Sequence, residues 1–270
     1  MLAQQRQSII LDHIKLHGGV RVSELTDVLG VSDMTVRRDL EALAARGMLE
    51  KVHGGATAIP QHSTDEPGFD AKSSLEQSEK EGIAARAAAM VRPGTAIAIS
   101  AGTTTWAMAR LLGDLPNLTV VTNSIPVAEI LYRIGGPGQT VVLTGGVRTP
   151  SNALVGPVAV NALRNLHVDL LFMGVHGMDE RRGFTTPNLM EADTNRALME
   201  AARRTVVVAD HTKWGVIGLS SIAALDEADV LITDELVPAE VRAALAEQVG
   251  ELIIAPAGPG LRPASDEAVS

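Results

Sequence analysis

The sequence contains no cysteine, only 2% aromatic residues and no apolar run approaching the length of a membrane helix. Without cysteine the chain forms no disulfide and has no thiolate chemistry. So few aromatic rings cannot form a stacking platform for single-stranded nucleic acid. A membrane helix needs about 18 consecutive apolar residues, and no basic-then-apolar signal segment opens the chain. Because 46% of the residues are hydrophobic, we expect a folded, soluble, cytoplasmic protein with no membrane partner.

Signs of metal binding or catalysis are also missing. The seven histidines are scattered without the spacing of a metal site, and no Ser/His/Asp set stands out. We therefore expect no metal, no cofactor and no catalytic residue.

Charge is distributed unevenly along the 270 residues. Residues 1–57 hold seven basic and seven acidic side chains, so the whole net charge of −9 lies beyond them. An acidic surface is repelled by nucleic acid. Any contact with a phosphate backbone should therefore come from the first 57 residues.

Those residues have the pattern of three short helices followed by a β-hairpin. We expect helices over 3–17, from Ser23 to Gly30 and from Ser32 to Gly47, where serine caps and glycine stops mark the ends. The stretch 20–22 is typical of an extended segment, and residues 48–56 of a strand with a Gly-Gly turn. This arrangement predicts a winged helix-turn-helix domain over residues 1–57.

The third helix has an apolar face and a basic face. At 100° per residue, Val36, Leu40 and Leu43 point inward while Arg38 points almost opposite, with Thr35 beside it. An arginine there suits a guanine edge or a phosphate. The alternative is an ordinary solvated helix face. The predicted DNA contacts, including the helix cap and the tip of the wing, are Ser32, Met34, Thr35, Arg37, Arg38, His53 and Gly54.

Two neighbours of these residues have other expected roles. Asp39 should pair with a nearby arginine rather than touch DNA. For His53 the alternative is an ordinary surface histidine.

Beyond a polar, proline-containing linker at 58–72, the pattern becomes that of an α/β domain over 73–255. Seven β-rich apolar runs alternate with amphipathic stretches, which predicts a mostly parallel buried sheet. The runs are 95–100, 118–124, 140–146, 168–175, 205–210, 230–234 and 251–255. Residues 256–270 have the composition of a disordered tail.

Polar turns at the ends of these runs predict a ligand site, because open parallel sheets bind ligands at the carboxyl ends of their strands. After the first run, Gly102 and three threonines begin a helix, a favourable place for a phosphate. A hydroxyl-rich helix cap without a ligand is the alternative. Lys213 is the best cation, and Glu191 is suited to accept bonds from hydroxyl groups. The predicted effector contacts are Gly102, Thr103, Thr104, Thr105, Asn123, Gly145, Gly146, Glu191 and Lys213.

Several charged residues near these turns remain open. Lys213 could be a surface lysine and Glu191 a first-turn carboxylate. Asp179 could also accept bonds from hydroxyls, Arg148 is an open candidate, and Lys80 is better suited to a structural or interface role.

The sequence resembles the DeoR family of bacterial transcriptional regulators. The resemblance rests on Arg6, Ile10, Ile14 and "VSDMTVRRDLEALAARGMLEKVHGGA", then on "EKEGIAARAAAMVRPGTAIAISAGTTT", "VVTNS", "VVLTGG", "LVGP", "GFTTPNLMEAD" and "VVVADHTKWG". It implies a repressor-type DNA-binding domain and a domain with a Rossmann-like fold similar to ribose-5-phosphate isomerase that senses a phosphorylated sugar.

We therefore expect a homo-oligomeric repressor of carbohydrate-metabolism genes that binds a double-stranded operator and is released by a phosphorylated sugar. The alternative is a sugar-phosphate isomerase with an appended DNA-binding domain. An architectural DNA-binding protein without a ligand fits poorly with so large a polar-mouthed α/β domain.

Overall fold

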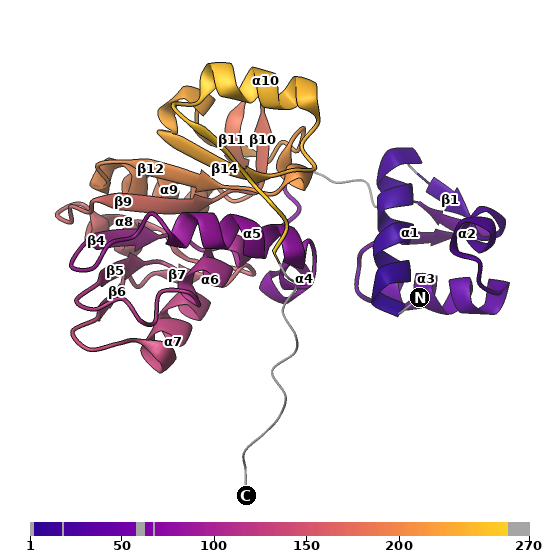
Figure 1. The fold of residues 1–270 in the computed structure, drawn as a ribbon, viewed down its shortest axis with the longest axis horizontal. Helices are drawn as coiled ribbons and strands as arrows, with labels where there is room; N and C mark the ends of the chain where they lie inside the picture. The colour runs from indigo at the N-terminus through magenta and orange to yellow at the C-terminus, as the bar shows by residue number, and fades with distance from the viewer. Residues whose placement is uncertain (1–2, 18, 58–62, 67, 259–270) are drawn as a thin grey trace, which may run out of the picture. The chain divides into compact units, whose positions relative to one another are not determined.

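The computed structural model describes residues 3–17, 19–57, 63–66 and 68–258, and the chain divides into two compact units, Met1–His62 and Ser63–Ser270 (Figure 1). Among the described residues, no helix has both the length and the apolar composition needed to span a bilayer. Each unit has a hydrophobic core of its own.

The N-terminal unit is a three-helix head with a small antiparallel sheet, as predicted. Its elements are α1 (Ala3–His17), β1 (Gly19–Arg21), α2 (Val22–Leu29), α3 (Asp33–Ala45), β2 (Glu50–Val52) and β3 (Gly55–Thr57). The strand order is β1-β3-β2, so that the wing hairpin β2-β3 pairs with the strand that precedes α2. Ile10, Leu25, Val36, Leu40 and Leu43 are buried together, which confirms the predicted inward face of α3.

Local signals set the helix ends in the head. The Ser32 side chain accepts a hydrogen bond from the Thr35 backbone N–H (3.3 Å), so the predicted cap of α3 is confirmed. Gly30, with φ of 63°, ends α2 in the left-handed conformation that glycine tolerates. The predicted Ser23 cap is wrong, because α2 begins at Val22 and its first turn is held by the Glu24 carboxylate, which accepts from the Arg21 N–H (3.0 Å).

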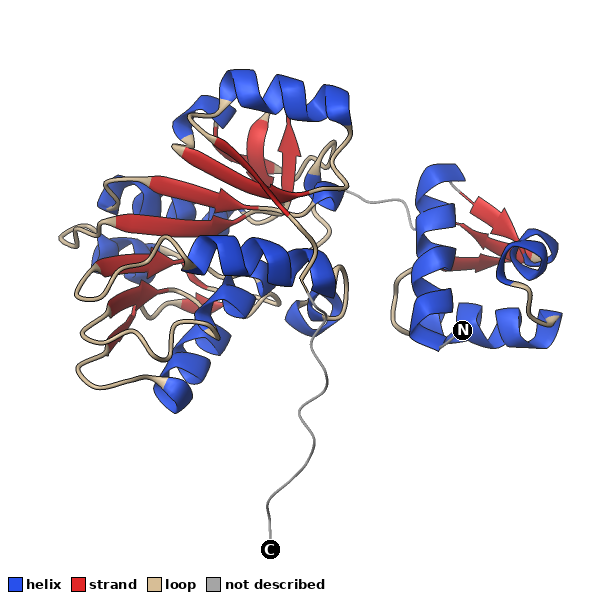
Figure 2. Ribbon diagram, viewed as in Figure 1, coloured by secondary structure: helices blue, strands red, loops and turns tan. Residues whose placement is uncertain are grey.

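The C-terminal unit is built on a seven-stranded parallel sheet with the order β15-β14-β12-β9-β4-β5-β6. Figure 2 shows strands in red among helices in blue. Its strands correspond to the seven predicted runs. They are β4 (Ala96–Ile99), β5 (Thr119–Thr122), β6 (Thr140–Leu143), β9 (Leu170–Gly174), β12 (Thr205–Val208), β14 (Val230–Asp234) and β15 (Leu252–Ala255).

Helices cover both faces of this sheet. One core joins the sheet to α8 (Pro157–Leu163), α9 (Leu189–Ala201) and α10 (Ala239–Gln248). The opposite core joins it to α5 (Gln77–Ala88), α6 (Thr103–Ala109) and α7 (Ile125–Ile134). Neighbouring residues of one strand serve opposite cores, as Leu171 and Phe172 do, because strand side chains alternate between faces. The inner strands β4, β5, β9, β12 and β14 are buried, which explains why they are continuous apolar runs in the sequence, whereas the edge strand β6 is mostly exposed.

Shorter elements were not predicted. They are the hairpin β7 (Val147–Arg148) and β8 (Leu154–Val155), and the antiparallel sheet of β10 (Gly177–Asp179), β11 (Gly183–Thr186) and β13 (Ser220–Ala223). The 3₁₀ turns η1 (His211–Lys213) and η2 (Leu225–Glu227) complete the unit.

Both predicted flexible segments differ from the structure. Residues 63–72 of the expected linker belong to the C-terminal unit and contain most of α4 (Phe69–Ser73), whereas 58–62 lie outside the described residues. Of the expected tail, residues 256–258 contact α5, since the Gly258 N–H donates to the Ser78 carbonyl (2.8 Å), and 259–270 lie outside the described residues. Polar composition concealed the backbone hydrogen bonds of Ser63, Phe69 and Gly258, which hold the described parts of these stretches.

An ion pair joins α1 to the inner edge of α3. The Arg6 Nε lies 2.7 Å from Asp39 Oδ2, and Asp39 is buried, which confirms the predicted pairing of this aspartate with an arginine. We expect Asp39→Ala to destabilise the head by about 3 kcal/mol, because it removes the buried carboxylate that pairs with the half-buried Arg6 guanidinium. Hydrogen exchange of the α3 amides would measure the loss.

Glu41→Ala is the matched control, since Glu41 lies on the same helix and pairs with Lys51 in solvent (3.0 Å). An exposed pair contributes less than about 1 kcal/mol. Equal effects of the two substitutions would contradict the role assigned to the Arg6–Asp39 pair.

Candidate functional site

One face of α3 is free of the core of the head. Met34 is 64% exposed, and Arg37 and Arg38 are exposed, as the helical periodicity predicts. Arg37 pairs with Asp33 one turn earlier (2.6 Å), whereas Arg38 has no hydrogen bond or ion pair within the described chain. The exposed face of α3 therefore presents one unpaired guanidinium, suited to an external anion or a base edge.

The N-terminal end of α3 also offers polar groups. The Ser32 and Thr35 hydroxyls lie 2.9 Å apart at the first turn, both accessible to solvent. These side chains have the chemistry for a phosphate or base contact, but they also serve the helix itself as its cap.

The wing tip is a tight turn between β2 and β3. Gly54 has a φ of 83°, and its carbonyl accepts from the Val22 N–H (2.9 Å). A Cβ at Gly55 would lie 2.1 Å from the Val20 carbonyl oxygen, so only glycine allows the wing to approach β1 this closely. His53 is exposed at this turn.

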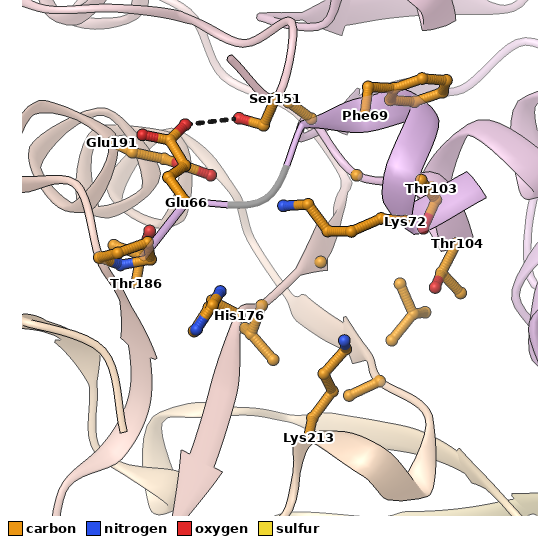
Figure 3. Close-up of a pocket in the computed structure, with 17 residues that line it drawn as sticks. Glu66, Phe69, Lys72, Thr103, Thr104, Ser151, His176, Thr186, Glu191 and Lys213 are labelled. Atoms are coloured by element: carbon orange, nitrogen blue, oxygen red, sulfur yellow. Dashed lines mark hydrogen bonds between the residues drawn. The ribbon is translucent and has the colours of Figure 1, made fainter. Parts of the chain in front are cut away.

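In the C-terminal unit, a polar cavity lies at the carboxyl ends of β4, β9 and β12 (Figure 3). Gly102, Thr103 and Thr104 follow β4, Gly174 and His176 come at the end of β9, and Lys213 follows β12. The full lining is Glu66, Phe69, Lys72, Ala101, Gly102, Thr103, Thr104, Ser151, Gly174, Val175, His176, Thr186, Pro187, Glu191, Val208, Ala209 and Lys213. The sheet therefore places the cavity where the strand-end rule predicts a ligand.

Two lysines reach into this cavity from different elements. Lys72 extends from α4 and Lys213 from the turn after β12, and both ammonium groups point into the space (Figure 3). Burial lowers the pKa of Lys72, and the positive charge of Lys213 lowers it further, whereas the Glu191 and Glu66 carboxylates raise it. Two cations that face the same space repel each other and would be stabilised by an anion between them.

A buried aspartate, Asp210, lies close to the Lys213 ammonium. The Lys213 Nζ lies 4.0 Å from Asp210 Oδ2, too far for a hydrogen bond, so the ammonium keeps its donors for another partner. Burial alone would raise the pKa of Asp210, but Lys213 and the Thr212 hydroxyl hold that pKa below its usual value. Asp210 is therefore a carboxylate that stabilises the lysine's charge.

Carboxylate and imidazole groups complete the polar lining. Burial raises the pKa of Glu191 to about 7, while the charge of Lys72 opposes the rise and that of Glu66 adds to it. Burial lowers the pKa of His176 to about 4, and the nearby Lys72 and Lys213 add to this effect. Near neutral pH the imidazole is uncharged and Glu191 is partly protonated, so both can exchange hydrogen bonds with hydroxyl groups.

The cavity contains five of the nine residues predicted for an effector: Gly102, Thr103, Thr104, Glu191 and Lys213. In α6 the first backbone bond runs from the Trp106 N–H to the Gly102 carbonyl (3.0 Å). The N–H groups of the preceding threonines therefore have no partner inside the helix. Because α6 has only seven residues, individual N–H groups and hydroxyls matter here more than the helix dipole.

The other four lie outside the lining. The Thr105 hydroxyl donates to the Ser100 carbonyl (2.8 Å), and the Asn123 amide joins the Ala101 N–H (3.0 Å) to the Leu154 carbonyl (3.2 Å). These two residues support the loop after β4 from beneath. Gly145 and Gly146 follow β6, the edge strand, which β5 separates from the strands around the cavity.

The sequence analysis did not predict several other residues that line the cavity. Glu66, Phe69 and Lys72 fell inside the expected linker, and Ser151 and Thr186 belong to short elements without a periodic signal. His176 could have been found, because it directly follows the predicted run 168–175.

The remaining charged candidates have structural partners. Lys80 is buried and donates to the Lys72 and Leu75 carbonyls (2.7 and 2.6 Å), so its structural role is confirmed. Asp179 accepts from two backbone N–H groups of the turn that follows it, and Arg148 donates to the Asn152 side chain (2.7 Å). Over the described part of the chain, no group of three or more His, Asp or Glu side chains could hold a metal ion.

A helix-turn-helix head with two exposed arginines on α3, joined to an α/β unit with a polar cavity, defines a DNA-binding regulator with a sensor domain. Comparison with known families agrees. The model of the DeoR-like helix-turn-helix domain matches residues 6–62, and that of the DeoR C terminal sensor domain matches residues 75–235. The chain belongs to the DeoR family of transcriptional regulators.

Relatives of this chain are similar over nearly their full lengths. The HTH-type transcriptional regulator YgbI of Escherichia coli K12 is 36% identical, over 94% of this chain and 99% of the relative. The putative aga operon transcriptional repressor of Escherichia coli O157:H7 is 33% identical, over 93% of each chain. The transcriptional repressor AccR of Agrobacterium fabrum is 34% identical, over 86% of this chain and 89% of the relative.

Solved structures match part of the chain. Ribose 5-phosphate isomerase A from Methanocaldococcus jannaschii has a TM-score of 0.37 and 17% identity, over 50% of this chain and 53% of the isomerase. Translation initiation factor eIF-2B from Pyrococcus horikoshii has a TM-score of 0.41 and 13% identity, over 78% of this chain and 72% of the factor.

The raised pKa of Glu191 predicts a pH-dependent stability. Between its ordinary value of 4.5 and about 7, the folded protein binds this proton more tightly than the unfolded chain does. The contribution of Glu191 to the free energy of unfolding therefore falls as pH rises through that range. We expect the Tm of Glu191→Gln, relative to the natural protein, to increase between pH 5 and pH 8, as measured by scanning calorimetry. A difference in Tm that does not change with pH would contradict this assignment.

Proposed function

We propose that this regulator is a cytoplasmic repressor of carbohydrate-metabolism genes that binds its operator as a homo-oligomer. The support is the exposed face of α3, where Met34, Thr35 and the unpaired Arg38 are presented by a head with no net charge. Two heads would place two such helices in major grooves about one DNA turn apart, or a multiple of that distance. Ser32, Arg37, His53 and Gly54 would add contacts to the phosphate backbone.

Arg38 provides the test of the DNA-binding face. We expect Arg38→Ala to lower operator affinity by about 1–3 kcal/mol, because it removes a guanidinium aimed at a base edge or phosphate. The measurement is a titration of the DNA upstream of the protein's own gene at fixed salt concentration. Arg164→Ala, which removes an exposed arginine from the acidic C-terminal unit, is the control and should leave the affinity unchanged. An Arg38→Ala variant with natural affinity would contradict the assignment of α3 as the recognition helix.

For the effector we propose a phosphorylated sugar bound in the cavity at the ends of β4, β9 and β12. One observation carries this proposal: Lys72 and Lys213 face the same space, which carboxylates and hydroxyls also line. A phosphate would relieve the repulsion between the two ammonium groups and accept bonds from the N–H groups of Thr103 and Thr104. Glu66, Glu191 and His176 have the chemistry to exchange hydrogen bonds with sugar hydroxyls.

Release from DNA requires the effector to bind two states of the protein with different affinity. In this proposal, the protein binds the operator when its cavity is empty. The names of the relatives, which include an aga operon repressor and the repressor AccR, support repression as the direction of control.

Lys213 provides the test of the sensor. A panel of glucose 6-phosphate, fructose 6-phosphate, ribose 5-phosphate and glycerol 3-phosphate should contain a compound that raises the Tm, because a ligand of the folded state stabilises it. We expect Lys213→Ala to reduce that rise, since it removes a pocket ammonium. Arg164→Ala is again the control.

A panel that changes neither the Tm nor operator release would count against a sugar-phosphate effector. The same samples test the alternative function. Conversion of aldose phosphate to ketose phosphate would show that Glu191 and the two lysines form an isomerase site rather than a sensor.

A further inference from the structure

The first described residues of the C-terminal unit, 63–66 and 68–75, form one wall of the cavity, and we call them the strap. The strap includes α4, and in sequence it follows directly on the stretch that leads from the DNA-binding head. Glu66, Phe69 and Lys72 line the cavity from this side (Figure 3). The first segment of the C-terminal unit thus contributes to the proposed effector site.

Hydrogen bonds attach the strap to the rest of the unit at its start, its middle and its end. At its start, the Leu219 N–H donates to the Ser63 carbonyl (2.7 Å). At its end, the buried ammonium of Lys80 holds the carbonyls of Lys72 and Leu75. Between these points, the Phe69 N–H donates to the Pro150 carbonyl (3.3 Å).

Side chains of the strap make further attachments. The Glu66 carboxylate accepts from the Ser151 hydroxyl (3.1 Å) and from the Asn188 amide (3.0 Å), and the Phe69 ring packs edge-on against Trp106 with centroids 5.9 Å apart. None of the five residues of α4 is buried. A segment with little buried apolar area has low local stability and responds readily to a ligand.

The side chains of Glu66 and Phe69 attach the strap to the rest of the unit, but the Lys72 ammonium does not. Within the described chain, Lys72 Nζ makes no hydrogen bond or ion pair, and the group points into the cavity opposite Lys213. An anion in the cavity would pull on Lys72, and sugar hydroxyls would compete for the Glu66 carboxylate that now binds Ser151 and Asn188. The occupied and empty cavities would therefore hold the strap differently.

We propose that the strap transmits effector binding to the DNA-binding head, with Lys72 as the residue through which the bound anion acts on it. This inference rests on the proposed sugar-phosphate effector. It requires no contact between the effector and the head. The effector changes how the strap is held, and the strap continues into the chain that leads to the head.

Substitution of each pocket lysine by methionine separates binding from transmission. Both Lys72→Met and Lys213→Met remove one ammonium from the cavity and keep a long side chain, but only Lys72 lies on the strap. The quantity compared is the ratio of operator Kd with and without a saturating sugar phosphate, for which we use the panel compound that raises the Tm most. We expect Lys213→Met to weaken binding of that compound but to keep the ratio within about twofold at saturation. We expect Lys72→Met to reduce the ratio by at least about fivefold, the low end of typical allosteric coupling.

A second measurement needs no change in the cavity. Because the chain has no cysteine, Ala71→Cys places a single thiol on the exposed face of α4 for an environment-sensitive dye. Ala85→Cys, exposed on α5, is the matched control outside the strap. We expect the sugar phosphate to change the emission at residue 71 and not at residue 85. It should also slow hydrogen exchange in strap peptides of the unsubstituted protein.

The outcomes distinguish the two proposals. If a sugar phosphate releases the operator while the dye at residue 71 and the strap amides do not respond, the strap proposal is wrong and the proposed effector stands. Equal coupling ratios for the two methionine variants at saturation would overturn it in the same way. If no sugar phosphate in the panel binds the protein or releases it from DNA, the proposed effector is wrong. The strap proposal is then wrong as well.

Discussion

The parallel seven-stranded sheet, whose five inner strands are buried, is the constraint on which the sensor unit depends. A strand buried on both faces must pair its backbone N–H and C=O groups with those of neighbouring strands. Because parallel strands run in the same direction, their carboxyl ends all lie at the same end of the sheet. The turns after β4, β9 and β12 lie together at this carboxyl end of the sheet and bring Thr103, His176 and Lys213 to one cavity. The apolar interior thus determines where the polar chemistry lies, although it supplies none of the polar groups.

Electrostatic balance then gives the cavity its character. Two lysines face the space, and two carboxylates and a neutral imidazole share it with them. Asp210, buried beneath Lys213, stabilises that charge without using its hydrogen-bond donors. Such a site is suited to a ligand with an anionic end and several hydroxyl groups.

In the head, a small core supports α3 while the outer face of this helix stays exposed. The head's three helices and short sheet must present one helix rigidly while leaving that helix's outer face free. The Arg6–Asp39 pair and the apolar side chains of α3 hold the inner side, and the close approach of the wing to β1 depends on Gly55. Among the described residues Arg38 has no partner, and it can remain unpaired there because the stability of the head comes from the opposite side of the helix.

Local patterns in the sequence were enough to predict the head and the main sheet. The Ser32 cap, the Gly30 stop and the periodicity of Val36, Leu40 and Leu43 depend on neighbours within one or two turns, so they can be read without a fold. The apolar runs of the five inner strands likewise reflect burial on both faces, whereas the run of the edge strand β6 lies mostly exposed. Polar residues directly after those runs, such as Thr104 and Lys213, followed from the general rule for parallel sheets.

Only the tertiary structure decided which of the predicted polar residues share the cavity. Strand order is a long-range property, and it places β6 at the edge, so that Gly145 and Gly146 lie outside the lining. Lys72 lies far from Lys213 in sequence and on a five-residue helix too short to show periodicity, so no local signal could bring the two together. The wall built by Glu66 and Lys72 exists because hydrogen bonds from distant segments hold the strap against the ends of the strands.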